Sequence, residues 1–278
     1  MLKYSSSGDY MIKLIGIDCD DTILNKKKEI SDYDAQIVKL TNDELKVKCV
    51  LTTGRPFVRK TIEYYKRLGI FGENQYFIAY NGAAIYDVYK EELLFSTTLS
   101  GKAIKEIHNV VKKYPVSHYI HKTGCICYDV LNEYSYLEKK FNDIELCNIN
   151  FDMISDSEEA FKYMLGGEPK LIEEIFLSIP SNIKEKYNVV ISMPCFLEFM
   201  DKSVNKWNGL VRLADRLLIR KNEIMAIGDS MNDYEMIKNS EIGVAMGNSL
   251  PKIIEIANYV TTSNDDSGVG KAIKELLF

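Results

Sequence analysis

Short apolar runs alternate with amphipathic stretches near both ends of the chain. Residues 13–18 (KLIGID) have the pattern of a buried strand, and residues 31–48 follow with helical spacing behind a capping Ser31. The same alternation predicts strands at 49–53, 76–80, 223–229, 242–247 and 259–263, and helices at 56–69, 204–218, 232–239, 249–257 and 268–277. Strands that alternate with helices pair in parallel through right-handed crossovers. The pattern therefore predicts an open α/β sheet.

The middle of the chain has a different pattern. Short β-like runs at 93–99, 116–121 and 125–130 lie close together, and a further run at 187–193 closes the segment. Helices are expected at 132–141, at 155–162 and from Pro169 onward. We therefore expect an inserted α+β domain at 88–194. Residues 11–87 and 195–278 would form a Rossmann-like, doubly wound parallel-sheet core, and residues 1–10 a disordered extension.

Polar residues follow the strands of the predicted core at the points where the strands end. Asp18 and Asp20 end the first strand, and Asp229 ends the strand at 223–229. The second and third strands are followed by Thr53, Gly54, Arg55, Asn81 and Gly82. Ligands bind at the carboxyl ends of the strands in open α/β sheets. We therefore expect these loops to build one site, with Lys206 bringing an ammonium group to it from the start of a helix.

This set of groups suits phosphoryl transfer. Carboxylates about 4 Å apart repel each other by about 1 kcal/mol even in water, and a divalent cation with oxygen ligands, Mg²⁺, relieves that repulsion. Thr53 and the backbone N–H groups near Gly54 can donate to a phosphate, and Lys206 supplies positive charge. Asp18 is then placed to attack phosphorus. Asp20 can protonate the leaving oxygen and later deprotonate water.

Each motif also has an ordinary structural interpretation when it stands alone. Residues 18–22 (DCDDT) are typical of a polar turn with a helix cap, and residues 228–233 (GDSMND) of a helix N-cap. Residues 18–29 also place carboxylates at positions one, three and twelve of a calcium-binding loop. Ile23 stands at the sixth position, where an EF-hand needs glycine, and this argues against such a loop. The joint order of the motifs, each after a strand, favours phosphoryl transfer.

Composition limits the classes of partner. The 278 residues carry a formal net charge of -5 and no long basic stripe, so we expect no nucleic-acid partner. No apolar run approaches the roughly 18 residues that a membrane span needs, so we expect no membrane partner. The six cysteines form no C-x-x-C pair. This argues against a zinc site or a disulfide framework and predicts a reducing, cytoplasmic location.

With these motifs, the chain resembles the Cof-type branch of the haloacid dehalogenase superfamily of phosphohydrolases. DCDDTIL resembles the first motif of the superfamily, LTTGR the second, VNKWNGL the third and GDSMNDYEMI the fourth. AYNGA, IGVAMGNS and YVTTSNDDSGVGKAI also match patterns of the branch. The resemblance covers residues 11–278 and is weakest in the inserted domain. It identifies that domain as a type IIB cap, which covers the site and reads the leaving group.

The resemblance implies roles for the matching residues. Asp18 would be the nucleophile and Asp20 the general acid and base. Mg²⁺ would be held by the Asp18 side chain, the Asp20 backbone carbonyl and the Asp229 side chain, with Asp233 acting from behind these ligands. The residues expected to contact the phosphoryl group or the substrate are Thr53, Gly54, Arg55, Asn81, Lys206 and Asn232.

Two of these residues, Thr53 and Lys206, would also be catalytic, because they grip the transferring phosphoryl group. The chain departs from the family pattern at two positions. Asp21 stands where glycine is often found, and Trp207 follows Lys206 where a small residue is commoner. Neither departure removes a required group.

The sequence therefore predicts a Mg²⁺-dependent phosphatase, a phosphoric monoester hydrolase that works through an aspartyl-phosphate. Its expected substrate is a small phosphorylated metabolite, either a sugar phosphate or a cofactor- or nucleotide-like phosphate, and its expected state is a monomer or weak homodimer. Two alternatives stay open. A phosphomutase would return the group to its substrate, and a receiver-like regulator would keep its phosphoaspartate. Asp20 argues against the regulator, because a general base beside the phosphoaspartate promotes its hydrolysis, whereas a switch gains by keeping it.

Overall fold

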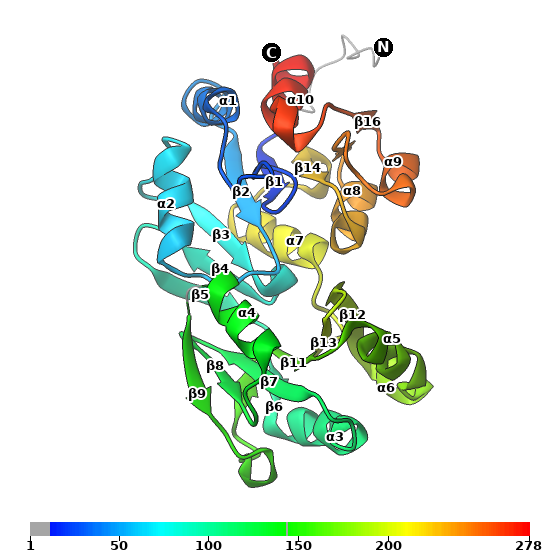
Figure 1. Cartoon of the computed structure of the whole chain (residues 1–278). Coiled ribbons are helices and arrows are strands. Elements are labelled where there is room, and N and C mark those ends of the chain that lie inside the picture. Colours follow the sequence, from blue (N-terminus) through cyan, green and yellow to red (C-terminus); the bar gives the residue numbers. More distant parts are fainter. Residues whose placement is uncertain (1–11, 143) are drawn as a thin grey trace. The chain divides into compact units, whose positions relative to one another are not determined.

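The computed structural model describes residues 12–142 and 144–278 and divides into two units (Figure 1). The first unit takes in the chain up to Thr52, then Tyr64–Tyr76 and Lys206–Phe278. The second takes in Thr53–Glu63 and Phe77–Asn205. The disordered extension predicted at 1–10 lies outside the described residues. The domain boundaries predicted from the sequence, with an insert at 88–194, stay a prediction. The second unit of the structure extends beyond that insert on both sides.

Parallel strands form the centre of the first unit. Five of them pair in the order β16-β15-β14-β1-β2. Their bounds are β1 (Leu14–Asp18), β2 (Lys48–Thr52), β14 (Ile224–Gly228), β15 (Ile242–Ala245) and β16 (Tyr259–Val260). Every residue of β1 and β14 is buried. These strands therefore read as continuous apolar runs, as expected for parallel strands covered on both faces.

The first unit contains α1 and four helices from the C-terminal part of the chain. Their bounds are α1 (Asp32–Asp43), α7 (Lys206–Arg216), α8 (Tyr234–Asn239), α9 (Pro251–Ile256) and α10 (Gly268–Leu277), with short 3₁₀ turns η3 (Lys221–Glu223), η4 (Met231–Asp233) and η5 (Asn264–Asp266). Ser31 caps α1 by accepting the N–H of Asp34 at 3.0 Å. Asp34 in turn accepts the N–H of Gly270 at 2.6 Å, so α1 and α10 lie side by side (Figure 1).

The second unit contains a six-stranded sheet in the order β12-β13-β11-β7-β8-β9, antiparallel except between β8 and β9. Its strands are β7 (Ser117–Lys122), β8 (Cys125–Tyr128), β9 (Glu145–Asn148), β11 (Lys162–Gly166), β12 (Tyr187–Met193) and β13 (Phe196–Asp201). Smaller elements are β4 (Ala84–Asp87) paired with β5 (Glu92–Ser96), β6 (Leu99–Ser100) paired with β10 (Glu159–Ala160), and the turns η1 (Tyr80–Gly82) and η2 (Phe151–Met153). Helix α2 (Arg59–Arg67) and strand β3 (Tyr76–Ala79) each have residues in both units.

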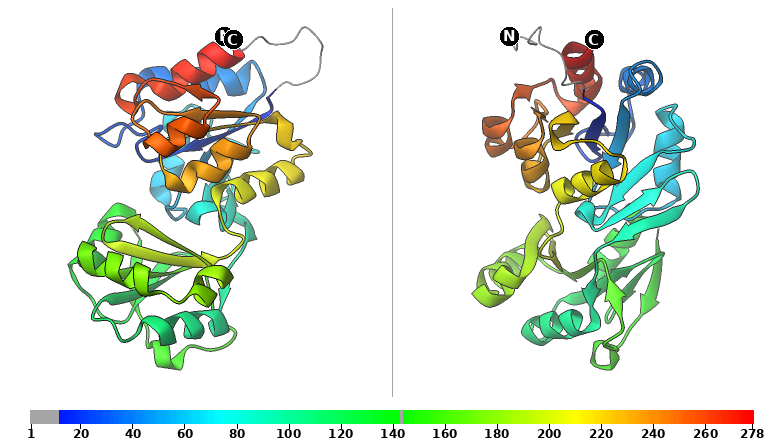
Figure 2. Two further views of the ribbon diagram at one scale, coloured as in Figure 1. Left: turned by 90° about the vertical axis from the view of Figure 1, so that its right-hand side faces the viewer. Right: turned by 180° about the vertical axis from the view of Figure 1, so that it is seen from behind.

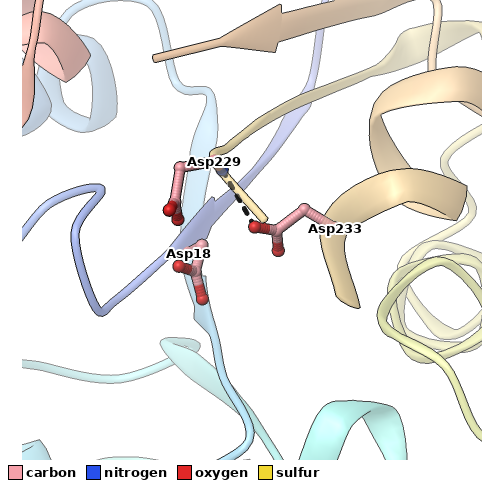
Figure 3. A group of neighbouring side chains, drawn as sticks. All are labelled: Asp18, Asp229 and Asp233. Atoms are coloured by element: carbon pink, nitrogen blue, oxygen red, sulfur yellow. Dashed lines mark hydrogen bonds between the residues drawn. The ribbon is translucent and has the colours of Figure 1, made fainter. Parts of the chain in front are cut away.

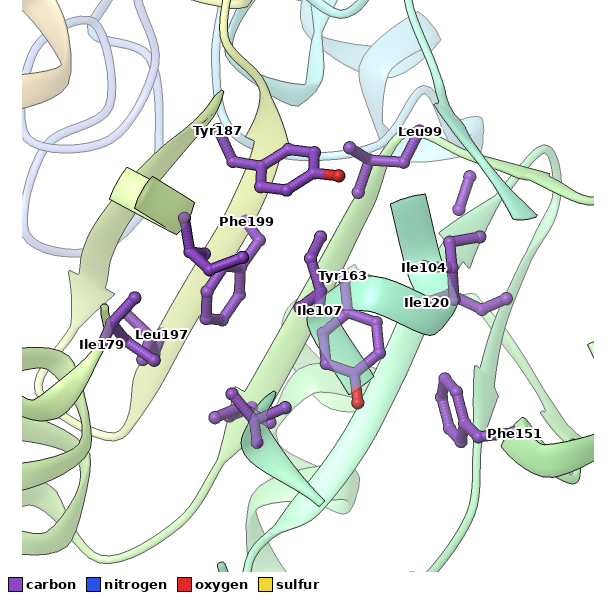
Figure 4. Close-up of a cluster of buried hydrophobic side chains, with 14 of the residues drawn as sticks. Leu99, Ile104, Ile107, Ile120, Phe151, Tyr163, Ile179, Tyr187, Leu197 and Phe199 are labelled. Atoms are coloured by element: carbon purple, nitrogen blue, oxygen red, sulfur yellow. The ribbon is translucent and has the colours of Figure 1, made fainter. Parts of the chain in front are cut away.

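One face of the six-stranded sheet is covered by helices α3 (Gly101–Val111), α5 (Pro169–Ser178) and α6 (Ser181–Lys186) (Figure 2). Ile107 of α3 packs there with Tyr163 of β11 and Phe199 of β13, all fully buried (Figure 4). On the other face, α4 (Glu133–Asn142) packs against a smaller apolar cluster that includes Tyr119 and Phe196. None of the helices in the two described ranges is long and apolar enough to cross a membrane.

The predicted fold class is confirmed, and most predicted elements are present. The helix expected at 155–162 is wrong: this stretch holds β10 and the start of β11. The backbone N–H of Ser157 donates to the Ser155 hydroxyl at 3.3 Å, and such local bonds between side chain and backbone compete with a helix. The helix expected from Pro56 begins at Arg59. The helix expected at 31–48 ends at Asp43, and α3 was not predicted.

Candidate active site

Asp18 and Asp229 come from neighbouring parallel strands. Asp18 is the last residue of β1, and Asp229 directly follows β14. Ile17 and Ile227 are partners in the register of these strands, so both carboxylates leave the same end of the sheet. One oxygen atom from each of Asp18, Asp229 and Asp233 lies within 4.8 Å of the other two (Figure 3). The structure thus brings together three of the four predicted metal-binding residues.

Asp233 is completely buried and held by backbone donors. It ends η4, and its Oδ2 accepts the N–H of Asp229 at 2.9 Å and the N–H of Ser230 at 3.1 Å. Gly228 leaves room for this carboxylate, because a Cβ atom there would lie 2.5 Å from the Cγ of Asp233. The position of Asp233 is therefore set by the loop that follows β14.

Lys206 supplies one buried positive charge to this group. It begins α7, and its Nζ lies 2.5 Å from Asp18 Oδ1 and 2.6 Å from Asp233 Oδ1. Leu210, one turn further along α7, lies over Gly16 of β1, where a Cβ atom would be 2.5 Å from its Cδ1. The small residue in β1 therefore lets α7 approach closely enough for Lys206 to reach both carboxylates.

Burial and mutual repulsion oppose ionisation of Asp18 and Asp229. Burial, followed by repulsion from Asp233, raises the pKa of Asp18 well above its usual value, and Lys206 offsets only part of this. Burial and Asp233 likewise raise the pKa of Asp229 to about 7. Burial alone would lower the pKa of Lys206, but the carboxylates of Asp18 and Asp233 outweigh it and raise that pKa. One ammonium group does not neutralise this cluster.

The three carboxylates fit a divalent cation. Their donors are all oxygen atoms, as Mg²⁺ and similar hard cations prefer. Oxygen ligands on opposite sides of a Mg²⁺ ion lie about 4.2 Å apart, so the separation of up to 4.8 Å requires only small side-chain rotations. A cation would also relieve the repulsion that raises the pKa values of Asp18 and Asp229. The structure therefore has a candidate metal centre at the carboxyl end of β1 and β14.

Thr22 is a residue of this site that the sequence analysis missed. It is buried, and its hydroxyl donates to Asp229 Oδ1 at 3.1 Å. Through this bond, the side chain of Thr22 orients the carboxylate of Asp229, although the two residues are 207 positions apart in the sequence. The only signal in the sequence is its position next to Asp20 and Asp21, which does not show where its side chain points.

Two other predicted residues, Asp20 and Asn232, lie outside the group of three carboxylates. The ammonium group of Lys28 lies 3.1 Å from Asp20 Oδ1 and 3.4 Å from Asp21 Oδ1. Asn232 is exposed on η4, and its side-chain oxygen accepts the hydroxyl of Ser230 at 2.7 Å. The predicted metal contact of Asp20 is through its backbone carbonyl, and it stays a prediction.

The loop after β1 is held by residues near the end of the chain. Asn248 donates to the carbonyl of Asp21 at 2.8 Å, and Asn264 donates to the carbonyl of Leu24 at 3.0 Å. Asn264 is itself positioned by the side chain of Asn248, which accepts its backbone N–H at 3.0 Å. No role for either asparagine was predicted. Their side chains fix the backbone of the segment that carries Asp20.

Four predicted substrate-binding residues lie together in the second unit. The N–H of Asn81 donates to the carbonyl of Thr53 at 2.8 Å, and the N–H of Arg55 donates to the Thr53 hydroxyl at 3.2 Å. Gly54 lies against the Asn81 side chain, where a Cβ atom would be 3.2 Å from the amide nitrogen. Asn81 has a left-handed backbone with φ of 55°, which asparagine tolerates. The loops that follow β2 and β3 are therefore joined by hydrogen bonds.

Comparisons with known proteins cover nearly the whole chain. The sequence model of the haloacid dehalogenase-like hydrolase family matches residues 15–273. YxeH of Bacillus subtilis is 32% identical over 269 residues, which are 96% of this chain and 99% of YxeH. The 5-amino-6-(5-phospho-D-ribitylamino)uracil phosphatase YcsE of the same organism is 27% identical, over 96% of each chain. The crystal structure of a haloacid dehalogenase-like hydrolase from Bacteroides thetaiotaomicron has a TM-score of 0.82 and 26% identity, and the match covers 95% of this chain and 99% of the other.

Proposed function

Because the chain belongs to the haloacid dehalogenase-like hydrolases, in their Cof-type branch, we propose that it is a Mg²⁺-dependent phosphatase of a small phosphorylated metabolite. Its reaction passes through an aspartyl-phosphate on Asp18. The observation that carries this proposal is the buried group of Asp18, Asp229 and Asp233, which Lys206 alone compensates among the described residues. Such an arrangement suits a cation and a phosphoryl group together.

Asp18 begins the reaction by attacking phosphorus. A bond forms between its carboxylate oxygen and phosphorus as the bond from phosphorus to the ester oxygen breaks. Asp20 gives its proton to the leaving oxygen and then takes a proton from water as that water attacks the phosphoaspartate. This second step releases inorganic phosphate and restores the Asp18 carboxylate. Lys206 holds Asp18 in place for both steps through its hydrogen bond.

The metal and the phosphoryl group have separate sets of residues in this proposal. Asp18, Asp229 and the backbone carbonyl of Asp20 would hold Mg²⁺, with Asp233 acting from behind these ligands, and the ion would supply positive charge to the phosphoryl oxygens. Thr53 and Lys206 grip the transferring group. Further contacts to phosphate or substrate are assigned to Gly54, Arg55, Asn81 and Asn232.

The substrate class is a sugar phosphate or a cofactor- or nucleotide-like phosphate. The relative YcsE is named for a substrate that joins a phosphorylated ribityl chain to a uracil ring, so it combines features of both. This similarity supports a small organic phosphate as the substrate here. The monomeric or weakly dimeric state and the cytoplasmic location stay predictions.

Release of phosphate from p-nitrophenyl phosphate tests the proposal. The wild-type protein should release phosphate with Mg²⁺, stop when EDTA removes the metal, and recover when Mg²⁺ is restored. Asp18→Asn should abolish release while the protein stays folded. Asp21→Asn is the matched control, because Asp21 is exposed and its carboxylate lies outside the group of three.

Two results would contradict the proposal. Full activity in Asp18→Asn would refute the nucleophile, and activity that EDTA leaves unchanged would refute the metal. Transfer of phosphate between positions of a bisphosphate without net release would instead favour a phosphomutase.

A further inference from the structure

Two charged side chains are buried in the six-stranded sheet of the second unit. Lys162 of β11 and Glu198 of β13 have side chains only 4% and 5% exposed. Their sequence neighbours Tyr163, Leu197 and Phe199 belong to the helix-covered core drawn in Figure 4. Because successive side chains of a strand point to opposite faces, Lys162 and Glu198 lie on the other face of the sheet.

Only one oxygen of the Glu198 carboxylate has hydrogen-bond partners. Lys162 Nζ lies 2.7 Å from Oε1, and the Ser192 hydroxyl donates to the same atom at 2.8 Å. The second oxygen, Oε2, is buried and has no hydrogen-bond partner among the described residues. A buried carboxylate with an unsatisfied oxygen destabilises the fold. This oxygen is therefore a hydrogen-bond acceptor for which the described residues supply no donor.

The pair is poorly explained by a purely structural role. Replacing a buried ion pair by well-packed apolar residues is often neutral or stabilising, and the same face already holds the apolar cluster around Tyr119 and Phe196. A Lys–Glu pair at this place costs the desolvation of two charges. Ligand binding would explain why the pair is present despite this cost, because both charges could then form hydrogen bonds to a bound molecule.

The pair is connected to the loops that are assigned to the substrate. Lys162 and His121 of β7 are register partners, and the His121 ring lies edge-on to the Tyr80 ring with centroids 6.1 Å apart. The N–H of Tyr80 donates to the carbonyl of Arg55 at 3.1 Å, and Asn81 follows Tyr80 directly. All of these residues belong to the second unit. His121 and Tyr80 therefore link the buried pair to the loops that carry Arg55 and Asn81.

We propose that Glu198 and Lys162 determine specificity by binding two neighbouring hydroxyl groups on the organic part of the phosphate ester. Glu198 Oε2 accepts a hydrogen bond from one hydroxyl, and Lys162 donates one of its remaining N–H bonds to the oxygen of the next. A cationic ligand is disfavoured by the adjacent ammonium group of Lys162. The substrate class is therefore a polyhydroxylated phosphate, a sugar or polyol phosphate. This inference rests on the proposed phosphatase function.

Paired substrates test this assignment. We expect Glu198→Gln to lower kcat/KM for D-ribose 5-phosphate and D-sorbitol 6-phosphate by about 10- to 100-fold, mainly through KM. The same variant should leave p-nitrophenyl phosphate, whose leaving group has no neighbouring hydroxyls, within about twofold of wild type. Glu158→Gln is the matched control, because Glu158 also pairs with a lysine of this unit, Lys122, at 2.6 Å. It should change neither class of substrate.

The results separate the inference from the function beneath it. An equal fall for all substrates in Glu198→Gln would show a structural role and overturn the assignment, as would no change in any of them. If Glu198→Gln does not fold, the double variant Lys162→Met/Glu198→Met removes both charges and should lose the preference for hydroxylated esters. Retention of that preference would refute the assignment. A wild-type protein that hydrolyses none of these esters, p-nitrophenyl phosphate included, would overturn the phosphatase proposal and the inference with it.

Discussion

The ammonium nitrogen of Lys206 lies 2.6 Å from a carboxylate oxygen of Asp233, and both side chains are completely buried. The same nitrogen bonds to Asp18, whose side chain is 6% exposed. A single positive charge thus serves two carboxylates that solvent barely reaches. Breaking such a group by removing one partner is costly, because the remaining charges stay buried without compensation.

Lys206→Met should therefore lower the free energy of unfolding by about 3–5 kcal/mol in protein stripped of metal. Urea unfolding followed by circular dichroism measures this. Lys26→Met is the control, because the Lys26 side chain is 82% exposed and its ion pair with Asp265 lies at the surface. That variant should change stability by less than about 1 kcal/mol. Equal losses in the two variants would contradict the importance of the buried charge.

Thr22 should tune metal affinity without touching the metal. Its hydroxyl orients the Asp229 carboxylate, and loss of a residue that orients a metal ligand costs about 10- to 100-fold in affinity. We expect Thr22→Val to raise the Mg²⁺ concentration that half-activates phosphate release by such a factor. Thr22→Ser keeps the hydroxyl and should stay close to wild type. If Thr22→Val needs no more Mg²⁺ than the wild type, the hydrogen bond to Asp229 does not set the metal affinity.

The charge of Asp229 should make stability depend on pH. Its pKa is about 7 in the fold, because of burial and Asp233, against about 3.9 when unfolded. The folded chain thus holds the extra proton between these values, and the contribution of Asp229 to stability falls as pH rises from about 4 to 7. In metal-stripped protein, we therefore expect Asp229→Asn to stabilise the fold by at least about 1 kcal/mol more at pH 8 than at pH 5.

Urea midpoints of the wild type and Asp229→Asn at the two pH values measure this difference. Added Mg²⁺ should stabilise the wild type at pH 8, because a bound ion favours the folded state and needs ionised ligands. It should stabilise Asp229→Asn much less. A variant that is equally stabilised at pH 5 and pH 8 would rule out the titration of Asp229 as the cause.

Gly16 should be needed for the approach of α7 to β1. A methyl group there would lie 2.5 Å from Leu210 Cδ1, and Leu210 is fully buried. We expect Gly16→Ala to destabilise the protein by about 1–3 kcal/mol and to lower phosphatase activity by displacing Lys206. Gly72→Ala is the control, since no atom lies within 4 Å of a Cβ atom at that position. Unchanged urea midpoint and activity in Gly16→Ala would show that the helix adapts.

The sequence was sufficient to predict the parallel strands and the carboxylates that follow them. Each buried strand is an unbroken apolar run, and Asp18 and Asp229 stand directly at the ends of two such runs. Thr22 could not be predicted in the same way. Its partner Asp229 is 207 residues away, and only the folded loop shows that the hydroxyl turns towards that carboxylate.

The second unit was harder to predict, because its register is not encoded by local patterns. The sequence pattern predicts a helix at 155–162 that includes Lys162, whereas in the structure Lys162 begins β11. Its contact with Glu198 depends on how β11 and β13 are aligned, and strand alignment follows from packing across the sheet. Two charges in separate apolar strands therefore look unrelated in the sequence.

The bonds from Asn248 and Asn264 to the loop after β1 also bear on how the protein is made. Translation yields the loop early and both asparagines late. An unfinished polypeptide on the ribosome therefore has its first carboxylates on a loop that still lacks these two bonds. The loop is fully held only once Asn248 and Asn264 have been made, so a truncation before Asn248 would disturb a site that includes Asp18.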